Sequence, residues 1–350
     1  MLNTGITMSN TYKSAGVDIE AGELAVQKMK EYVHETYNEN CLTELGSFGG
    51  LFKCAFSDYE EPVLVSSIDG VGTKVKIASM MNKYDTVGQD IVNHCIDDIL
   101  VQGASPLFFM DYFATAKLDP IVASEIVKGM SIACKENGCA ILGGETAEMP
   151  GVYSKGEFDI AGSIVGVVDR KKIIDGTKIT PNLSIIGFAS SGAHTNGYSL
   201  IRKLFFEDNN YSVNDKIEGF DKTLGETLLA PHKCYYKTVK ELLKTYEIYG
   251  MAHITGGGFY SNIKRILPDN ITVEIDAKAW NVPPLFKKIQ ELGKIENTEM
   301  YKAFNMGIGL CLFVDKDKAN DIINKANSLN EKAFLIGKTK DAAKSVRVIF

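Results

Sequence analysis

The sequence predicts an α/β protein built from two domains. Its 350 residues exceed the usual size of one domain, and predicted strands alternate with predicted helices in both halves of the chain. Glycines gather in a few loops that follow predicted strands. Because glycine permits tight turns and close approach of a ligand to the backbone, these loops are the first places to look for function.

Composition excludes several classes of function. Hydrophobic residues make up 45% and charged residues 23% of the chain, which is typical of a folded globular protein. The formal net charge of −6 leaves no excess of cations for a nucleic acid. The seven cysteines lack zinc-site spacing, and no apolar run approaches the length of a spanning helix. We expect a cytoplasmic protein with reduced thiols and without a nucleic-acid or membrane partner.

The elements of the N-terminal half follow from periodicity and from helix end signals. Ala25, Met29 and Val33 recur every four residues and predict an amphipathic helix over 21–37. Asp119-Pro120 is a helix start and Gly138 a helix stop. Short apolar runs predict four strands: Pro62–Ile68, Pro106–Ala114, Cys139–Leu142 and Phe158–Val168.

A helix predicted over Asp85–Gln102 has two stripes of side chains. The apolar stripe consists of Val87, Ile91, Cys95 and Ile99. The polar stripe consists of Asp90, His94, Asp97 and Asp98. Such a polar stripe is more often a solvated face than a ligand site, and both interpretations stay open here.

The charged, turn-rich segment 169–182 is the best candidate for a domain boundary. We therefore predict domains over 1–172 and 173–350. The second half repeats the alternation of elements, with helices before Tyr246 and a helix over Lys316–Leu329. Its predicted strands are Leu183–Ala189, Ile271–Ile275, Ile308–Val314, Lys332–Gly337 and Ser345–Phe350.

Carboxylates beside glycines are the first candidate for chemistry. Asp69 lies in SIDGVGTK, Asp97 and Asp98 in IDDILVQGASP, and Glu145 in the predicted loop GGETAEMPG. Oxygen ligands of this kind suit Mg²⁺ held between carboxylates and a substrate phosphate. For a single Asp-Gly pair, an ordinary turn is an equally good interpretation.

Two further loops join small residues to histidine, and both standard phosphate-binding motifs are absent from the chain. SSGAHTNG, residues 190–197, follows a predicted strand and opens a helix, which favours either an anion site or a capping loop. HITGGG, residues 253–258, puts three glycines beside a titratable imidazole. The polar side chains of Lys13, Thr73 and Lys74 stand near these glycine loops in the sequence.

At these residues the sequence resembles a known family, the phosphoribosylformylglycinamidine cyclo-ligases or AIR synthetases of purine biosynthesis. The resemblance runs from YKSAGVD at residue 12 to the C-terminal strands. It includes PVLVSSIDGVGTK, VQGASPLFF, GGETAEMPG, SSGAHTNGYSL, HITGGGF and MYKAFNMGIG in that order. An ordered series of this kind is far more specific than any one motif.

The resemblance implies an N-terminal sheet that completes a barrel across a homodimer, with the active site in a cleft between the domains. It implies ATP and Mg²⁺ as cofactors and formylglycinamidine ribonucleotide as the substrate, cyclised to aminoimidazole ribonucleotide. The ATP contacts would be Lys13, Gly46, Gly49, Gly50, Asp69, Gly72, Thr73, Lys74 and Gly144. The substrate contacts would be Ser191, Gly192, His194, Thr195, Asn196, Gly256 and Gly257.

The same resemblance implies roles for several titratable residues. Asp69, Asp98 and Glu145 would be the metal ligands, and Lys74 would add positive charge at the transferred phosphoryl group. His253 or His194 would accept the proton released in ring closure. One departure touches this site, because the family usually has Asn-Asp where this chain has Asp97-Asp98; we expect Asp97 to modulate the metal site without being essential. Another ATP-using superfamily member, or a non-catalytic nucleotide-binding protein of this fold, is the alternative.

Overall fold

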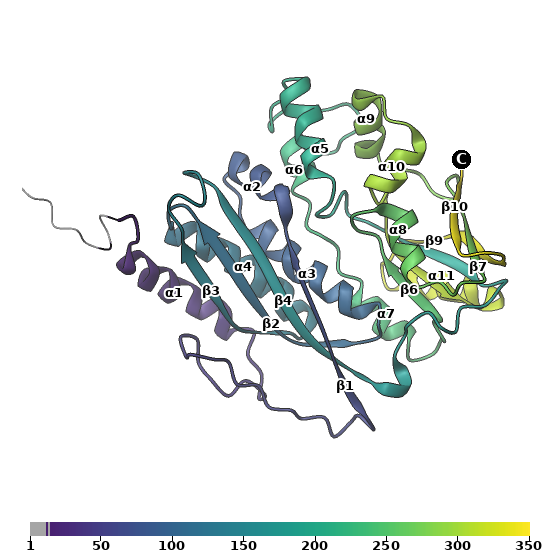
Figure 1. The fold of residues 1–350 in the computed structure, drawn as a ribbon, viewed down its shortest axis with the longest axis horizontal. Helices are drawn as coiled ribbons and strands as arrows, with labels where there is room; N and C mark the ends of the chain where they lie inside the picture. The colour runs from purple at the N-terminus through teal and green to yellow at the C-terminus, as the bar shows by residue number, and fades with distance from the viewer. Residues whose placement is uncertain (1–11, 13–14) are drawn as a thin grey trace, which may run out of the picture.

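The computed structural model describes Tyr12 and residues 15–350, and Lys13 lies outside the described residues. Two sheets form, one in each half of the chain, with helices packed against both (Figure 1). The first lies within residues 62–169 and the second within residues 184–349. The predicted α/β class is confirmed, while the predicted boundary after residue 172 stays a prediction.

The N-terminal half contains a four-stranded sheet of order β1-β4-β2-β3. β4 pairs antiparallel with both β1 and β2, and β2 pairs parallel with the edge strand β3. Its elements are α1 (Ile19–His34), β1 (Pro62–Gly70), α2 (Val75–Met81), α3 (Asp85–Leu100), β2 (Ser105–Thr115), α4 (Pro120–Asn137), β3 (Ala140–Glu148) and β4 (Phe158–Asp169).

The C-terminal half contains a six-stranded sheet of order β10-β7-β9-β5-β8-β6. Its strands are β5 (Ser184–Ala189), β6 (Gly250–His253), β7 (Ile271–Asp276), β8 (Ile308–Val314), β9 (Ala333–Asp341) and β10 (Ser345–Ile349). Its helices are α5 (Tyr198–Arg202), α6 (Leu224–Leu228), α7 (Tyr236–Leu242), α8 (Gly258–Arg265), α9 (Pro284–Gly293), α10 (Asn297–Ala303) and α11 (Ala319–Ser328).

The sequence signals for helix ends predicted the ends of α4 correctly, whereas the segment Gly143-Gly144-Glu145 did not form the expected loop. Asp119 caps α4 through a hydrogen bond from the Ile121 N–H, and Gly138 ends it in a left-handed conformation. The expectation of a loop at Gly143-Gly144-Glu145 is wrong, because β3 continues through Glu148 along the long strand β2. A Cβ at Gly144 would lie 2.2 Å from Oδ1 of Asp111, so glycine leaves room for that carboxylate.

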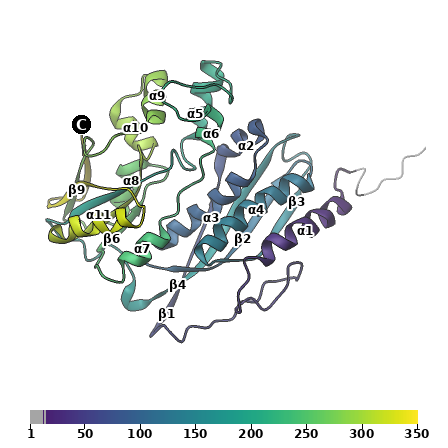
Figure 2. The ribbon, with the colours of Figure 1, turned by 180° about the vertical axis from the view of Figure 1, so that it is seen from behind.

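Helices α1, α3 and α4 cover one face of the N-terminal sheet (Figure 2). The other face lacks such a cover among the described residues, and apolar side chains on it are exposed. Leu64 is 59%, Ile68 72% and Tyr112 38% exposed. An apolar surface of this kind favours a further binding partner.

Helix α3 lies between the two halves of the chain, so its polar stripe is buried instead of solvated. Asp90 and Asp97 are 0% exposed. Asp90 accepts a hydrogen bond from the His232 N–H at 2.6 Å, and Asp97 accepts one from the Tyr235 N–H at 2.9 Å. Asn93 donates to the His232 carbonyl at 2.7 Å. Side chains of α3 therefore hold the main chain of the segment 232–235.

All seven cysteines are free thiols, and four of them are buried. Among the described residues, no helix has the length and apolar character needed to cross a membrane.

Asp97 occupies a site that disfavours its charge. Burial raises the pKa of Asp97 well above its ordinary value, and the charge of Asp98 raises it further. A protonated carboxyl group offers one acceptor oxygen and one donor, as an asparagine amide does. The raised pKa shifts Asp97 toward the protonated form, in which a carboxyl oxygen can still accept the Tyr235 N–H.

We expect Asp97→Asn to stabilise the fold in a pH-dependent way. A raised native pKa favours folding fully below the unfolded value of about 3.9, and that contribution is lost as the pH rises through the native pKa. Asparagine does not titrate, so the variant should gain over the wild type above about pH 4, by about 1.4 kcal/mol for each unit of pKa elevation.

Urea unfolding of both proteins between acid and neutral pH measures this difference in the free energy of unfolding. The exposed Asp58→Asn variant is the control and should follow the wild type. A difference for Asp97→Asn that does not change with pH would contradict the raised pKa of Asp97.

Candidate active site

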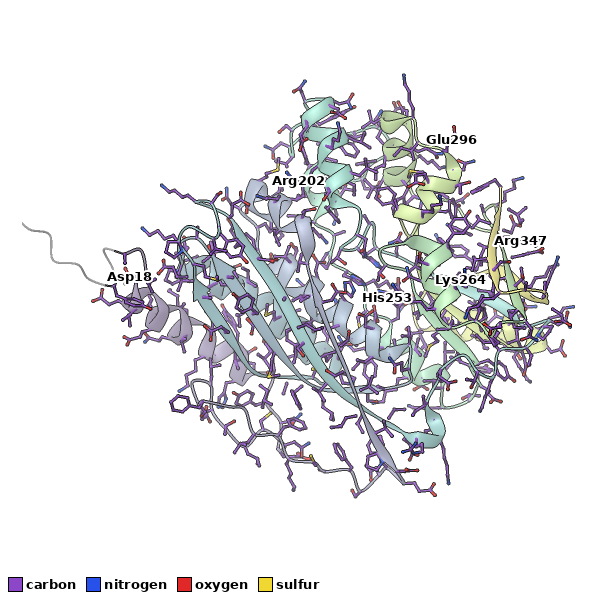
Figure 3. The ribbon with its side chains drawn as sticks, viewed as in Figure 1. Asp18, Arg202, His253, Lys264, Glu296 and Arg347 are labelled. Carbon is purple, nitrogen blue, oxygen red and sulfur yellow. The ribbon has the colours of Figure 1, made fainter. Side chains whose placement is uncertain are left out.

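Four of the five histidines meet between the two halves of the chain. His94 lies on α3, His253 ends β6, His194 lies in the loop 190–197, and His232 lies in the segment held by α3. Figure 3 labels His253 between the N-terminal sheet and the helices of the C-terminal half. The ring centroid of His94 lies 5.1 Å from that of His232 and 5.2 Å from that of His253.

Two partly exposed carboxylates contact these imidazoles. Nε2 of His94 lies 3.0 Å from Asp69 Oδ2 and 3.8 Å from Asp98 Oδ2. Nδ1 of His253 lies 2.9 Å from Asp98 Oδ1. The side chains of Asp69 and Asp98 are 42% and 27% exposed, whereas His94 and His253 are buried behind them. Asp98 and His253, which were predicted separately as a metal ligand and a base, are thus in contact, and Asp69 lies beside them.

These contacts set the electrostatics of the site. Burial alone would raise the pKa of Asp69 and Asp98, but hydrogen bonds to His94 and His253 outweigh it and lower both pKa values. Burial would lower the pKa of His94, but Asp69 and Asp98 raise it. Burial dominates at His253 and lowers its pKa. Lowered pKa values favour the ionised form of both carboxylates.

His194 and His232 form an uncharged layer behind this pair. Their rings stack with centroids 4.0 Å apart. Burial, followed by the neighbouring positive groups, lowers the pKa of both well below the ordinary value. Thr195 Oγ1 lies 2.9 Å from His94 Nδ1 and 3.5 Å from His232 Nδ1, which links the two layers.

The two predicted substrate loops face each other. A Cβ at Gly256 would lie 3.3 Å from Oδ1 of Asn196, so the loops 190–197 and 253–258 nearly touch. Gly257 precedes α8 as its N-terminal cap and has φ +90, a left-handed conformation that glycine adopts easily. A cavity of about 290 Å³ adjoins the first loop and is lined by Ser191 and Gly192 among others.

Lys74 lies buried where the two halves of the chain meet, and its side chain does not reach the surface. Its side chain is 0% exposed, and Nζ lies 2.8 Å from Oδ2 of the equally buried Asp90. Nζ also donates to the Ala230 carbonyl at 2.8 Å. In this arrangement both contacts of Lys74 Nζ are internal, and its predicted contact with a phosphoryl group stays a prediction.

The predicted ATP residues divide into two groups. Gly46, Gly49, Gly50 and Gly144 line one cavity of about 550 Å³ together with Glu145. Gly72 and Thr73 lie instead beside the substrate loops, where Thr73 Oγ1 is 3.1 Å from Ser199 Oγ. The glycine cavity adjoins β3 and the carboxylate–imidazole cluster adjoins the end of β1, and these two strands are the opposite edges of the sheet.

The three predicted metal ligands do not form one site within a chain. The register aligns Asp69 with Gly162, Gly162 with Asp111, and Asp111 with Gly144. Three strand spacings of about 4.8 Å separate Asp69 from Gly144 by about 14 Å. Mg²⁺ prefers an all-oxygen shell, and Asp69 and Asp98 are paired with nitrogens, so the expected three-carboxylate magnesium site does not fit a single chain.

Sequence reasoning missed three residues. His94 was named only as part of the polar stripe of the helix and not as a site residue, although it lies one helical turn from Asp98 and so shares its face. His232 had no signal in the sequence. Asp111 lines the glycine cavity, and burial, then the charge of Glu145, raises its pKa to about 7.

Comparisons with known proteins give the chain a family. Residues 53–168 match the model of the AIR synthase related protein N-terminal domain, and residues 180–349 match its C-terminal domain. The phosphoribosylformylglycinamidine cyclo-ligase of Bacillus cytotoxicus is 53% identical over 333 residues, covering 95% of this chain and 96% of the relative. That of Alkaliphilus metalliredigens is 49% identical, covering 96% and 97%.

Solved structures share the fold at low identity. Thiamine-monophosphate kinase from Stenotrophomonas maltophilia has a TM-score of 0.67 at 14% identity, covering 93% of this chain and 95% of that one. The hydrogenase maturation protein HypE in complex with ATP has a TM-score of 0.62 at 16% identity, covering 97% and 92%. On the near full-length identity to its curated relatives, the chain belongs to the phosphoribosylformylglycinamidine cyclo-ligase family.

Proposed function

We propose that this protein cyclises formylglycinamidine ribonucleotide to aminoimidazole ribonucleotide and converts ATP to ADP and phosphate. The observation that carries the proposal is 53% identity to a named cyclo-ligase over 95% of the chain. The geometry supports it, because Asp98 contacts His253 of the loop 253–258, and His94 beside it contacts Thr195 of the loop 190–197. Free thiols fit the cytoplasm, where cysteines stay reduced.

The reaction needs ATP because a formamide carbon is a poor electrophile and its oxygen a poor leaving group. Transfer of the γ-phosphoryl group to that oxygen would give an imino-phosphate. The amine nitrogen of the same molecule then attacks the carbon and phosphate leaves. Holding the two reacting groups together gives a large rate gain from proximity.

The Asp98–His253 pair is suited to accept the proton released in ring closure. Both ring nitrogens of His253 have partners, Asp98 at Nδ1 and His232 at Nε2, both within 3.0 Å. The proton would therefore pass to the exposed Asp98 carboxylate, with His253 orienting that carboxylate from behind. His194 would hold the loop 190–197, since its Nε2 accepts the Ser191 N–H at 3.3 Å.

ATP is proposed to occupy the glycine cavity. Its volume of about 550 Å³ is within the usual range for a small-molecule site. Magnesium bound to the nucleotide would neutralise phosphate charge, and Glu145 is the carboxylate that could hold it at this cavity. Asp69 and Asp98 remain proposed ligands of a divalent cation at the cleft.

A homodimer is proposed because the N-terminal sheet exposes an apolar face. Ile68, Ser163 and Met110 lie in one row across β1, β4 and β2 on that face. A second copy of the same sheet would bury the exposed apolar side chains, each Å² contributing about 25 cal/mol. The barrel expected from the family would arise in this way.

The activity has a direct test. Incubation of the full chain with formylglycinamidine ribonucleotide and Mg-ATP should give aminoimidazole ribonucleotide and ADP in equal amounts. Omission of the ribonucleotide is the control and should abolish ADP formation. Release of AMP and pyrophosphate, or ADP without the imidazole product, would refute the cyclo-ligase assignment.

The role of His253 is tested by His253→Ala. Loss of the imidazole should slow the single-turnover rate by about a hundredfold or more, while the dissociation constant for ATP changes little, since the glycine cavity lies across the sheet. His34→Ala, on the exposed side of α1, is the matched control. An unchanged single-turnover rate would leave His253 with a packing role.

The dimer is tested by sedimentation at micromolar protein. We expect the mass of two chains, and Ile68→Lys should shift the equilibrium toward one chain because it places a charge in the buried face. Leu335→Lys, at another exposed apolar residue far along the sequence, is the control. A wild-type mass of one chain would contradict the proposal.

A further inference from the structure

The connection between α10 and β8 contacts the loop 190–197 at both of its ends. The Gly307 carbonyl of this connection accepts a hydrogen bond from the Ser190 N–H at 2.9 Å. At the other end of the loop, a Cβ at Gly197 would lie 2.2 Å from Cε1 of Phe304, so the aromatic ring leaves room only for glycine. The connection belongs to the motif MYKAFNMGIG, to which the carboxylates and imidazoles of the site give no role.

Within this connection, the side chain of Asn305 holds the start of the loop. Its Nδ2 donates to the Gly192 carbonyl at 2.9 Å, and its Oδ1 accepts from Ser190 Oγ at 3.2 Å. The same Oδ1 accepts the Gly307 N–H at 2.9 Å, which ties the amide to its own segment. Asn305 is 3% exposed. Because these contacts need both a donor and an acceptor, they match an amide and not a carboxylate.

The connection is itself anchored in the core by Trp280, the only tryptophan of the sequence. The indole Nε1–H of Trp280 donates to the Met306 carbonyl at 3.0 Å. The indole also stacks on Phe259 of α8, with ring centroids 5.9 Å apart and an interplanar angle of 20°. Asn305 therefore contacts the loop from a segment whose neighbouring residue is fixed by buried aromatic packing.

The peptide unit between Gly192 and Ala193 is the part of the loop that Asn305 orients. In a trans peptide the N–H points away from the carbonyl, so the bond from Asn305 to the Gly192 carbonyl also fixes the direction of the Ala193 N–H. This N–H has no hydrogen-bond partner among the described residues, although Ala193 is only 3% exposed. A buried N–H without a partner is rare in folded proteins, which favours a bound acceptor here.

We propose that Asn305 is a positioning residue that directs the Ala193 N–H toward an anionic group of the ribonucleotide. The inference rests on the proposed function, in which the loop 190–197 contacts the substrate. The cavity of about 290 Å³ lined by Ser191 and Gly192 adjoins this peptide. A phosphate oxygen is an ionised acceptor, and hydrogen bonds from a backbone N–H to such acceptors are strong.

Steady-state kinetics of the full-length chain test the proposal with Asn305→Asp. The variant replaces the Nδ2 donor by an acceptor of the same shape, which repels the Gly192 carbonyl and favours a turned peptide. We expect the KM for the ribonucleotide to rise about tenfold or more, as for loss of a hydrogen bond to a charged group, with kcat and the KM for ATP within about twofold of the wild type.

Asn137→Asp is the matched control. Asn137 is buried in α4, and its Nδ2 donates to the Ala133 carbonyl at 2.8 Å. The control therefore loses a similar bond from a buried amide to a carbonyl, away from the loop 190–197. We expect both KM values of this variant to match those of the wild type.

Hydrogen exchange followed by mass spectrometry gives a readout that does not depend on turnover. Exchange in the loop 190–197 should be faster in Asn305→Asp than in the wild type, and exchange in α11 should be equal in both. The fluorescence emission of Trp280 checks that the connection stays packed in the variant. If Asn305→Asp does not fold, Ser190→Ala removes only the hydroxyl contact with Asn305 and should raise the same KM by a smaller factor.

Three outcomes would overturn the proposal. An equal KM for the ribonucleotide in wild type and Asn305→Asp would exclude Asn305 from substrate positioning. A lower kcat with an unchanged KM would assign its effect to the chemical step. Equal exchange of the loop in both proteins would show that Asn305 does not hold it. A wild type that forms no aminoimidazole ribonucleotide would instead refute the proposed function, and the exchange measurement would still decide whether Asn305 holds the loop.

Discussion

The hydrogen bonds from side chains of α3 to the main chain of the segment 232–235 are the constraint on which the site depends. Residues 232–235 precede α7 and belong to no helix or strand, so their buried peptide groups need hydrogen-bond partners from other parts of the chain. Asp90, Asn93 and Asp97 supply them from one helix face. Because His94 and Asp98 lie on the same helix, one rigid element sets their positions against His232 and His253.

Local sequence signals predicted where helices begin and end. Tertiary packing determined how far β3 extends and which residues meet at the site. The ends of α4 were predictable because capping acts within a few residues. The continuation of β3 through Gly144 was not, because it depends on pairing with the distant strand β2. At the site, Asp98 and His253 stood in recognisable motifs, whereas His232 joins them only after two halves of the chain meet. The burial of Lys74 against Asp90 depends on the same meeting.

The site arranges carboxylates and imidazoles in successive layers from the surface inward. Asp69 and Asp98 are partly exposed, and His94 and His253 stand behind them. His194 and His232 lie deeper and stay neutral because burial lowers their pKa. The layers are connected by Thr195 and by the contact between His232 and His253. A cation or a proton arriving at these carboxylates therefore affects imidazoles that solvent does not reach.

Three hydrogen bonds from Asp90, Asn93 and Asp97 of α3 to the segment 232–235 end on peptide groups, which has an evolutionary consequence. Backbone N–H and C=O groups are common to nearly all residue types, so the side chain at residue 232 can be exchanged without removing the bonds that hold the segment. A substitution of this side chain can therefore change the chemistry of the site while the hydrogen bonds between the two halves remain. During evolution, single substitutions could change the side chains behind Asp98 while the fold that positions them stays the same.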